Sequence, residues 1–386
     1  NKSIQYMYHG NPTVQSGSFN MTTVSLRTAF RSPGSAKNGY RNRTFTDFQR
    51  NLDVMQQRVE RRYIGTQYPQ GTGMQGTFNP ANGTVDKYSA DVMIPAFLAA
   101  YTGRDARKSA LDIFPTLSKM LPNWNVTYKG LSNLPWVRDN FKSVNLTHGY
   151  KSTYSIGAYQ SYSSWISAMG SGGELGYALN ATTGNYQPSS MFDISTVSLN
   201  ESFSPLIGLN MTFMNNMTLK MEYKTTRVAT LSVTSAQINE TGSKDMVIGW
   251  GYKINDFRLS SIFGSGKAST KAKKRTPNSR KRNADQKEPE VTPATKSNFA
   301  HDLNLRFDFS LRNQNAIRRD LQTSLSEATS GSKAFKTSAA VEYTVSRMVS
   351  LSLYYDRQRS EPLLSSSSYP TITQDFGMSM KFSLTR

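Results

Sequence analysis

An alternation of apolar and polar residues with a period of two recurs along the chain and constrains its fold most strongly. From Asp302 to Leu311 every odd position is apolar, while every even position is polar or charged. Successive side chains of a β-strand point to opposite faces, so this pattern predicts strands with one apolar and one polar face. The pattern recurs at Phe335, Thr337, Ala339, Val341, Tyr343 and Val345, at Val349, Leu351, Leu353 and Tyr355, and at Phe376, Met378, Met380, Phe382 and Leu384.

Strands of this kind predict an all-β fold, and we interpret it as a transmembrane outer-membrane β-barrel. A sheet in lipid must close on itself to satisfy its backbone groups, with apolar residues outward and polar residues toward the lumen. A soluble sandwich would show the same alternation. The expected strand lengths of about 10 to 20 residues, with Phe, Tyr and Met on the apolar faces, favour the barrel. About 13 antiparallel strands are expected in this chain.

The composition narrows the classes of function. The chain has no cysteine and three histidines, which leaves no disulfide framework or thiolate site and makes a histidine-built metal site improbable. Its longest apolar run is about half the roughly 18 residues of a transmembrane helix. The formal charge is +20, and residues 264–296 hold ten Lys or Arg against three Asp or Glu, a contribution of 10 − 3 = +7. A basic balance fits nucleic acid, anionic lipid or an anionic passenger, and no feature selects nucleic acid.

The alternation divides the chain into five segments. Residues 46–120 depart from it, with helical spacing at 46–63 and a compact apolar run at 91–101, so we expect a helical insertion or cap between strands. We expect residues 1–45 and 121–262 to be barrel strands, 263–301 a basic disordered loop, and 302–386 the C-terminal barrel strands.

Short polar runs predict the turns between strands. Asn215–Asn216, Arg312–Asn315 and Val345–Met348 each separate two alternating runs. Counting back from a periplasmic C-terminus then places the loops 263–301 and 360–371 outside the cell. On that side the basic loop could bind lipopolysaccharide phosphates; the simpler interpretation is a disordered loop that is only solvated by water.

Several phrases in the second half of the chain resemble the C-terminal part of the SprA/Sov family, the outer-membrane translocon of the type IX secretion system. The likeness covers about residues 120–386, and the family consists of very large single-chain barrels. It implies that this chain is the C-terminal portion of such a barrel, within a longer protein. The basic insert and the ending Phe382-Ser383-Leu384-Thr385-Arg386 depart from the family pattern. The phrases lie at 121–132, 141–154, 203–208, 215–218 with 222–223, and 247–252.

The resemblance implies a function and a set of partners. It implies a protein-conducting pore that exports folded cargo with C-terminal targeting domains, gliding-motility adhesins among them, and that makes or breaks no bond. It also implies a PorV-like barrel shuttle, a periplasmic plug protein and the secreted cargo as partners. The alternatives are another outer-membrane transporter, of TonB-dependent or lipopolysaccharide-insertion type, and a soluble basic β-rich binding protein.

No catalytic, cofactor-binding or metal-binding residue is assigned. Gly264–Ala268 lacks the spacing of a phosphate loop, and Gly170–Gly176 lacks that of a dinucleotide loop. His148 lies on the apolar parity of its strand, which favours a sheet contact over a hydrolase site. Asn-x-Ser/Thr triplets at Asn145, Asn210 and Asn239 fit a repeating polar face better than glycan acceptors. A set of charges of lumen parity is expected to keep a pore hydrated, namely Lys220, Glu222, Lys224, Arg306, Asp308, Arg312, Asp356 and Lys381.

Overall fold

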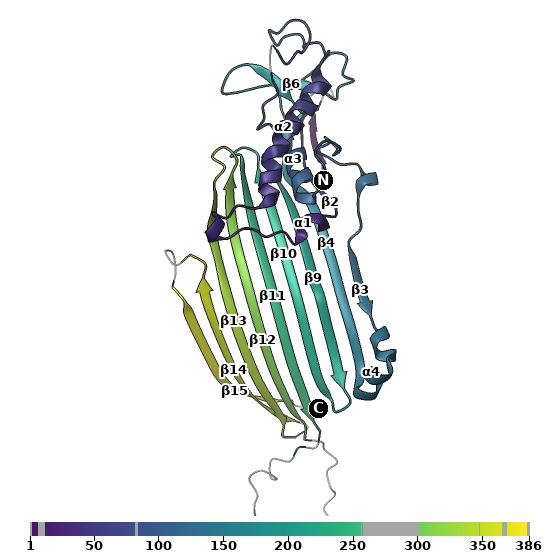
Figure 1. The fold of residues 1–386 in the computed structure, drawn as a ribbon, viewed down its shortest axis with the longest axis vertical. Coiled ribbons are helices and arrows are strands. Elements are labelled where there is room, and N and C mark those ends of the chain that lie inside the picture. The colour runs from purple at the N-terminus through teal and green to yellow at the C-terminus, as the bar shows by residue number, and fades with distance from the viewer. Residues whose placement is uncertain are drawn as a thin grey trace, which may run out of the picture.

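The computed structural model describes a protein dominated by one large antiparallel sheet with most of its helical structure packed at one end (Figure 1). The residues described are 2–6, 12–81, 84–255, 257, 301–346, 348–364 and 369–383. Within these ranges, no helix combines the length and the apolar composition needed to cross a membrane.

The large sheet has twelve strands, and most neighbours in the sheet are also neighbours in sequence. Its order is β1-β2-β4-β9-β10-β11-β12-β13-β14-β15, and β3 and β8 also pair with β4. The bounds are β1 (Lys2–Tyr6), β2 (Pro12–Thr22), β3 (Trp124–Tyr128), β4 (Phe141–Ser161), β8 (Phe192–Ile194), β9 (Thr196–Phe213), β10 (Met217–Ser232), β11 (Gln237–Ile254), β12 (Leu303–Asp320), β13 (Ser326–Thr344), β14 (Val349–Pro362) and β15 (Thr371–Phe382).

The sheet is open in the part of the chain described. Its path begins at β1 and ends at β15, and those two strands do not pair with each other. The strands from β9 to β13 are 16 to 19 residues long. At about 3.4 Å per residue they extend well beyond the 9 to 11 residues that span a bilayer. The antiparallel β architecture expected from the alternation is confirmed, and closure into a barrel remains a proposal.

Two predictions about strand ends are wrong. Arg312–Asn315 is not a turn, because β12 continues through it to Asp320 and pairs with β11 throughout. Without that turn there is one strand fewer between residue 302 and the C-terminus than we expected, so each earlier connection moves to the other end of the sheet. The connection between β11 and β12 therefore lies at the end where β15 finishes. The segment between β14 and β15 lies at the other end. The two loops that we placed on the same side are therefore on opposite sides, and residues 263–300 themselves lie outside the described ranges.

Two further stretches differ from the expected strands. Strand structure in residues 1–45 stops at Thr22, after which come α1 (Leu26–Ala29) and the short 3-10 helix η1 (Ala36–Asn38). Between β4 and β9 the chain makes β8 and a separate small sheet of β5 (Ile166–Ser167), β6 (Gly176–Leu179) and β7 (Tyr186–Ser189). The predicted turn at Asn215–Asn216 is present, and Asn216 has a φ of 66°, which asparagine tolerates.

The helical part consists mainly of two packed helices between β2 and β3. α2 (Arg43–Tyr63) begins where the Asn42 side chain accepts a hydrogen bond from the backbone N–H of Phe45, and it buries one stripe from Phe45 to Tyr63. α3 (Ala90–Thr102) is buried on nearly all sides and ends at Gly103 in the left-handed conformation. The minor helical elements are η2 (Leu117–Lys119), η3 (Gly130–Asn133) and α4 (Pro135–Asn140).

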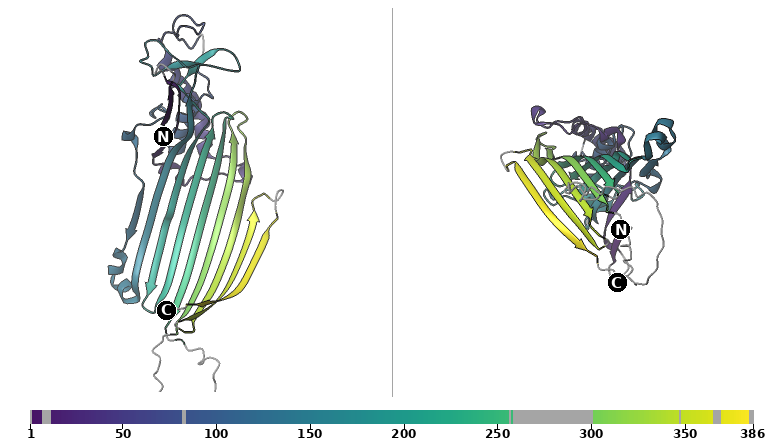
Figure 2. Two further views of the ribbon diagram at one scale, coloured as in Figure 1. Left: turned by 180° about the vertical axis from the view of Figure 1, so that it is seen from behind. Right: turned by 90° about the horizontal axis from the view of Figure 1, so that it is seen from below.

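We call residues 23–121 the helical subdomain and the end of the sheet that it covers the helical end. The subdomain packs across one face of the sheet (Figures 1 and 2). Its core is continuous with buried residues of five strands of the large sheet, including Tyr154, Leu199, Leu231 and Ile238, and with Tyr177 of the small sheet. The hairpins between β10 and β11 and between β12 and β13 lie at the helical end, and the end of β15 lies at the opposite end.

Candidate functional site: a two-faced sheet and its helical cover

All eight charges predicted to share one face do so. The ladder places Lys220 beside Gly249, Gly249 beside Asp308, and Asp308 beside Ser338 in a single row across the sheet. The other charges fall on the same parity of rows, with Asp356 beside Ser338 and Lys381 beside Ser350. We call this side the polar face. Asn145, Asn210 and Asn239 also lie on it.

The charges of the polar face are largely paired with one another. Glu222 receives both Lys220 and Lys224 at 3.0 Å, and the two amines hold the carboxylate between them. Opposite charges set side by side keep a surface hydrated while lowering its net field, so it offers no strong attraction to a charged passenger. Further pairs are Arg306–Asp308 at 2.6 Å, Arg312–Asp245 at 2.9 Å, Lys253–Asp302 at 2.7 Å and Lys336–Asp356 at 3.4 Å.

The opposite side, which we call the belt face, carries an uninterrupted apolar belt over β10 to β15. Register places Leu219, Trp250, Phe307, Ala339, Tyr355 and Phe376 in one row. The next row of this face toward the end of β15 is equally apolar. The next row toward the helical end is apolar on β10 to β12 and reaches Thr337, Arg357 and Gln374 on β13 to β15. The belt consists of Met217, Leu219, Met221 and Tyr223; Met246, Ile248, Trp250, Tyr252 and Ile254; Leu303, Leu305, Phe307, Phe309 and Leu311; Phe335, Thr337, Ala339, Val341 and Tyr343; Val349, Leu351, Leu353 and Tyr355; and Phe376, Met378, Met380 and Phe382. Thr337 is its single polar member.

The belt has the height and slant of a membrane-facing band. On β12 it runs from Leu303 to Leu311, a stretch of nine residues, against the 9 to 11 residues of a tilted strand that spans a bilayer. Toward the helical end the belt stops at Phe335 on β13 but at Tyr355 on β14. Tyr355 pairs with Ala339, so the limit on β14 lies four residues nearer the opposite end. A limit that steps across the rows is expected when the strands are tilted in a flat slab. Several of these side chains are exposed, Phe376 at 73% and Phe307 at 43%.

The helical subdomain covers the belt face beyond the belt. Leu199, Ala229 and Ile238, which it buries, have the same parity as the belt residues of their strands. In the structure α2 and α3 share one buried core, and this core is attached to the belt face of the sheet. A role of the insertion as a cap stays a prediction. If the polar face lines a lumen, the subdomain lies outside the wall.

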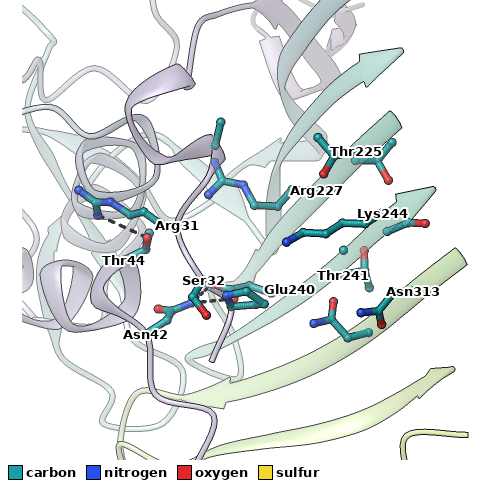
Figure 3. A pocket seen from close by; sticks show the side chains of 16 residues that line it. Arg31, Ser32, Asn42, Thr44, Thr225, Arg227, Glu240, Thr241, Lys244 and Asn313 are labelled. Carbon is teal, nitrogen blue, oxygen red and sulfur yellow. Dashed lines mark hydrogen bonds between the residues drawn. The ribbon is translucent and has the colours of Figure 1, made fainter. Parts of the chain in front are cut away.

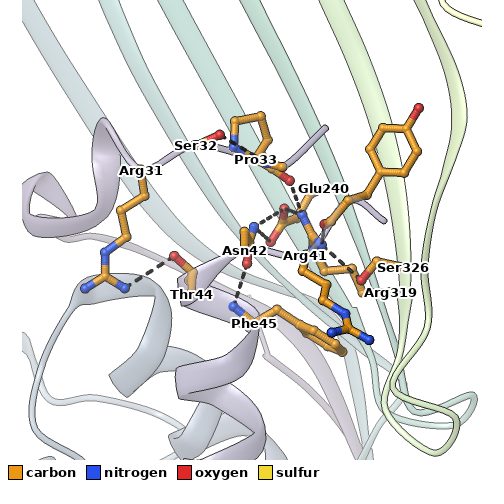
Figure 4. A network of polar contacts seen from close by, with 12 residues as sticks. Arg31, Ser32, Pro33, Arg41, Asn42, Thr44, Phe45, Glu240, Arg319 and Ser326 are labelled. Atoms are coloured by element: carbon orange, nitrogen blue, oxygen red, sulfur yellow. Dashed lines mark hydrogen bonds and ion pairs between the residues drawn. The ribbon is translucent and has the colours of Figure 1, made fainter. Parts of the chain in front are cut away.

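A buried ion pair between β11 and β12 fixes the subdomain to the sheet. Arg319, fully buried, binds Glu240 at 2.7 Å and donates to the carbonyl of Pro33 at 2.6 Å and to that of Tyr40 (Figure 4). Glu240 also accepts hydrogen bonds from Asn42 at 3.1 Å and from the Tyr101 hydroxyl. Burial and the adjacent Glu240 raise the pKa of Tyr101, which keeps that hydroxyl protonated as a donor.

A second ion pair, with a buried carboxylate and a half-buried arginine, repeats this arrangement two strands away. Glu201 on β9 binds Arg227 on β10 at 3.0 Å, and it accepts from the Ser25 hydroxyl at 2.6 Å and the Tyr150 hydroxyl at 2.9 Å. Arg227 donates to the carbonyl of Thr28 at 3.0 Å and to its hydroxyl at 2.8 Å. Sequence reasoning missed both pairs. A signal was present, because these charges occupy the parity that the apolar residues of the same strands hold.

A recess opens between the two ion pairs, where the 29–44 segment crosses the sheet (Figure 3). Its floor is the belt face of β10 to β12 just beyond the apolar belt. Lys244 extends along this floor toward Arg227. Other lining residues are Arg31, Asn42, Thr44, Thr225, Asn313 and Asn315.

The motifs that we declined have these positions. The Nδ1 of His148 lies 2.7 Å from the carbonyl oxygen of Leu206, among the aromatic rings of Trp124 and Phe203, so it is a sheet contact. Residues 170–175 form turns and bends that lead into β6 at Gly176, while Gly264–Ala268 lies outside the described residues. Across the described ranges, no group of three or more His, Asp or Glu is placed to hold a metal ion.

Asp91 makes the stability of the subdomain depend on pH. Burial raises the pKa of this carboxyl, against a hydrogen bond from the backbone N–H of Ser190 at 2.6 Å. The fold therefore prefers the protonated form, whose stabilising effect is complete below the unfolded value of about 3.9 and is lost as pH rises through the folded pKa. We expect Asp91→Asn to unfold at increasingly higher temperature than the wild type as pH rises above about 4.

Thermal unfolding of the purified protein across a pH series measures this difference. Asp53→Asn, exposed on α2, is the matched control and should follow the wild type. A gap between Asp91→Asn and wild type that stays constant with pH would contradict the assignment.

Neither a scan against protein-family models nor a search of the curated proteins finds a match to this chain.

Proposed function

We propose that the large sheet is part of the wall of an outer-membrane β-barrel, with its apolar belt in lipid and its polar face toward a lumen. The observation that carries this proposal is that the same strands have an apolar belt on one face and a charged, hydrated surface on the other. An apolar belt runs over six strands and reaches the nine residues of a bilayer-spanning strand on β11, β12 and β13, and the reverse side of the same strands carries charges largely compensated within the face. A soluble sheet has no need for an exposed belt of this height.

We further propose that the whole protein is the protein-conducting pore of a type IX secretion system, as its resemblance to the SprA/Sov family implies. The pore would export folded cargo with C-terminal targeting domains, including gliding adhesins, by passage without catalysis. Its proposed partners are a PorV-like barrel shuttle, a periplasmic plug protein and the cargo. The polar face supports this role because a wall of paired charges is hydrated and presents little apolar surface to a moving protein.

The test is affinity purification of the natively tagged protein from outer membranes in mild detergent, followed by mass spectrometry. The expected result is a chain far larger than 386 residues, recovered with a PorV-like barrel and type IX cargo. Recovery from the soluble fraction would contradict the membrane wall. Recovery from the outer membrane without these partners would contradict the secretion role while leaving the wall intact.

The charge pairing of the polar face yields a separate prediction. Reversal of Glu222, Asp308 and Asp356 to lysine would convert one Lys-Glu-Lys triad and two ion pairs into clusters of positive charge. We expect lower secretion of cargo at an unchanged level of the protein in the outer membrane, measured by immunoblot of medium and membrane. Leu305→Ile, on the belt face of β12, is the control that leaves the lumen untouched. Normal secretion by the triple variant would contradict a role for pairing.

A further inference from the structure

The positive charges at the upper limit of the apolar belt differ from those of the polar face because they are not compensated. We define the rim as the first residue beyond the belt, toward the helical end, on each of β10 to β15: Thr225, Lys244, Asn313, Lys333, Arg357 and Gln374. None of the three rim cations forms an ion pair with any other described residue. All three are exposed.

Cations on the polar face of the same strands are paired, so the lack of ion pairs is a property of the rim. On the same strands, Lys253 of β11 and Lys336 of β13 each have a carboxylate within 3.4 Å on the polar face. Beside the rim, Glu361 is the cross-strand neighbour of Lys333, but its carboxylate binds Arg359. Within the described residues the rim cations are therefore free to bind an anion from outside the chain.

The rim lies where lipid headgroups would meet the protein. Below Lys244 on β11 the belt begins at Met246, and below Lys333 on β13 it begins at Phe335. A lipid whose chains lie on the belt places its headgroup at the rim. The recess adjoins the rim at Lys244, and Asn313 and Asn315 also line it.

We propose that the rim binds the phosphate groups of lipopolysaccharide in the leaflet at the helical end. This inference rests on the proposed membrane wall. The strand β15 finishes at the end of the sheet opposite the helical end, so a periplasmic C-terminus places the helical end outside the cell and the rim at the outer leaflet. The helical subdomain and the 162–195 segment are then extracellular connections, and the connection between β11 and β12 lies on the periplasmic side. Lys244 and Lys333 are two strands apart in one row, about 10 Å, so a lipid with two phosphates can engage both. Arg357 supplies a third donor on the adjoining strand.

The experiment measures lipopolysaccharide retained by the full-length protein after purification from outer membranes. The rim variant is Lys244→Gln with Lys333→Gln and Arg357→Gln, and the control is Lys253→Gln with Lys336→Gln and Arg312→Gln, which removes the same charge from the polar face. Each rim cation is expected to change the affinity about fivefold, and all three on the order of 100-fold. The control should retain lipopolysaccharide as the wild type does.

A second measurement uses the wild-type protein and so does not depend on variant folding. Delipidated protein in nanodiscs of phosphatidylcholine is offered lipopolysaccharide, its dephosphorylated form or phosphatidylglycerol. We expect lipopolysaccharide to bind most tightly and the dephosphorylated form to lose binding. Equal retention by rim and control variants, equal binding of the dephosphorylated form, or preference for phosphatidylglycerol would overturn the proposal. A protein absent from the outer membrane would instead refute the proposed wall.

Discussion

Replacing Arg319 by methionine should release the helical subdomain from the sheet while the sheet remains assembled. The change removes one partner of a buried ion pair and leaves the Glu240 carboxylate without its cation, which costs about 3–5 kcal/mol. The carbonyl groups of Pro33 and Tyr40 lose their donor as well. We expect faster proteolysis between α2 and α3 and faster hydrogen exchange in both helices, measured on the purified protein.

Arg318→Met is the matched control for this change. Arg318 is the preceding residue on β12, is exposed on the polar face and pairs with Glu327, an arrangement that contributes about 0–1 kcal/mol. A double variant, Arg319→Met with Glu240→Leu, should recover part of the lost stability, because it removes the unpaired charge. Equal protection of the helices in Arg319→Met and Arg318→Met would show that the pair does not hold the subdomain.

The alternation predicted a strand correctly where one face of the sheet is apolar and the other polar, and it failed where both faces are polar. Between Leu303 and Leu311 one face is apolar and the other polar, so the alternation is clear and the strand is predicted correctly. Beyond Leu311 the chain reads Arg-Asn-Gln-Asn, polar on both faces, because at the rim both sides lie outside the apolar belt. The pattern stopped there while the strand did not, and we misread the change as a turn.

The position of the helical subdomain depends on long-range contacts that periodicity does not encode. The spacing within 43–63 and the apolar run in α3 predicted helices, but not which face of the sheet they cover. That information resides in Glu201, Arg227, Glu240 and Arg319, which interrupt the apolar parity of their strands. A charge at such a position predicts a buried partner, yet the partner lies up to 286 residues away in sequence, at Pro33.

Replacing Phe307 by arginine should prevent assembly of the protein in the outer membrane. Phe307 lies at the centre of the belt on β12 and is 43% exposed, so a water-soluble sheet would accept arginine there at little cost. In a barrel wall the same charge enters the middle of the bilayer, at about 2–4 kcal/mol. Ser310→Arg, on the polar face of the same strand, is the matched control and should assemble normally.

An arginine scan along the belt face of β12 separates the two cases further. In a membrane, the cost should be greatest at Phe307, smaller at Leu303 and Leu311, and near zero at Asn313 in the rim, because the penalty falls with distance from the bilayer centre. The measurement is the fraction of folded protein in outer membranes, read from heat-modifiable migration. In water the cost would instead follow the packing of each side chain, with no maximum at the middle of the belt. A flat profile with normal assembly of Phe307→Arg would exclude lipid from this face, and both the wall and the rim proposal would fall together.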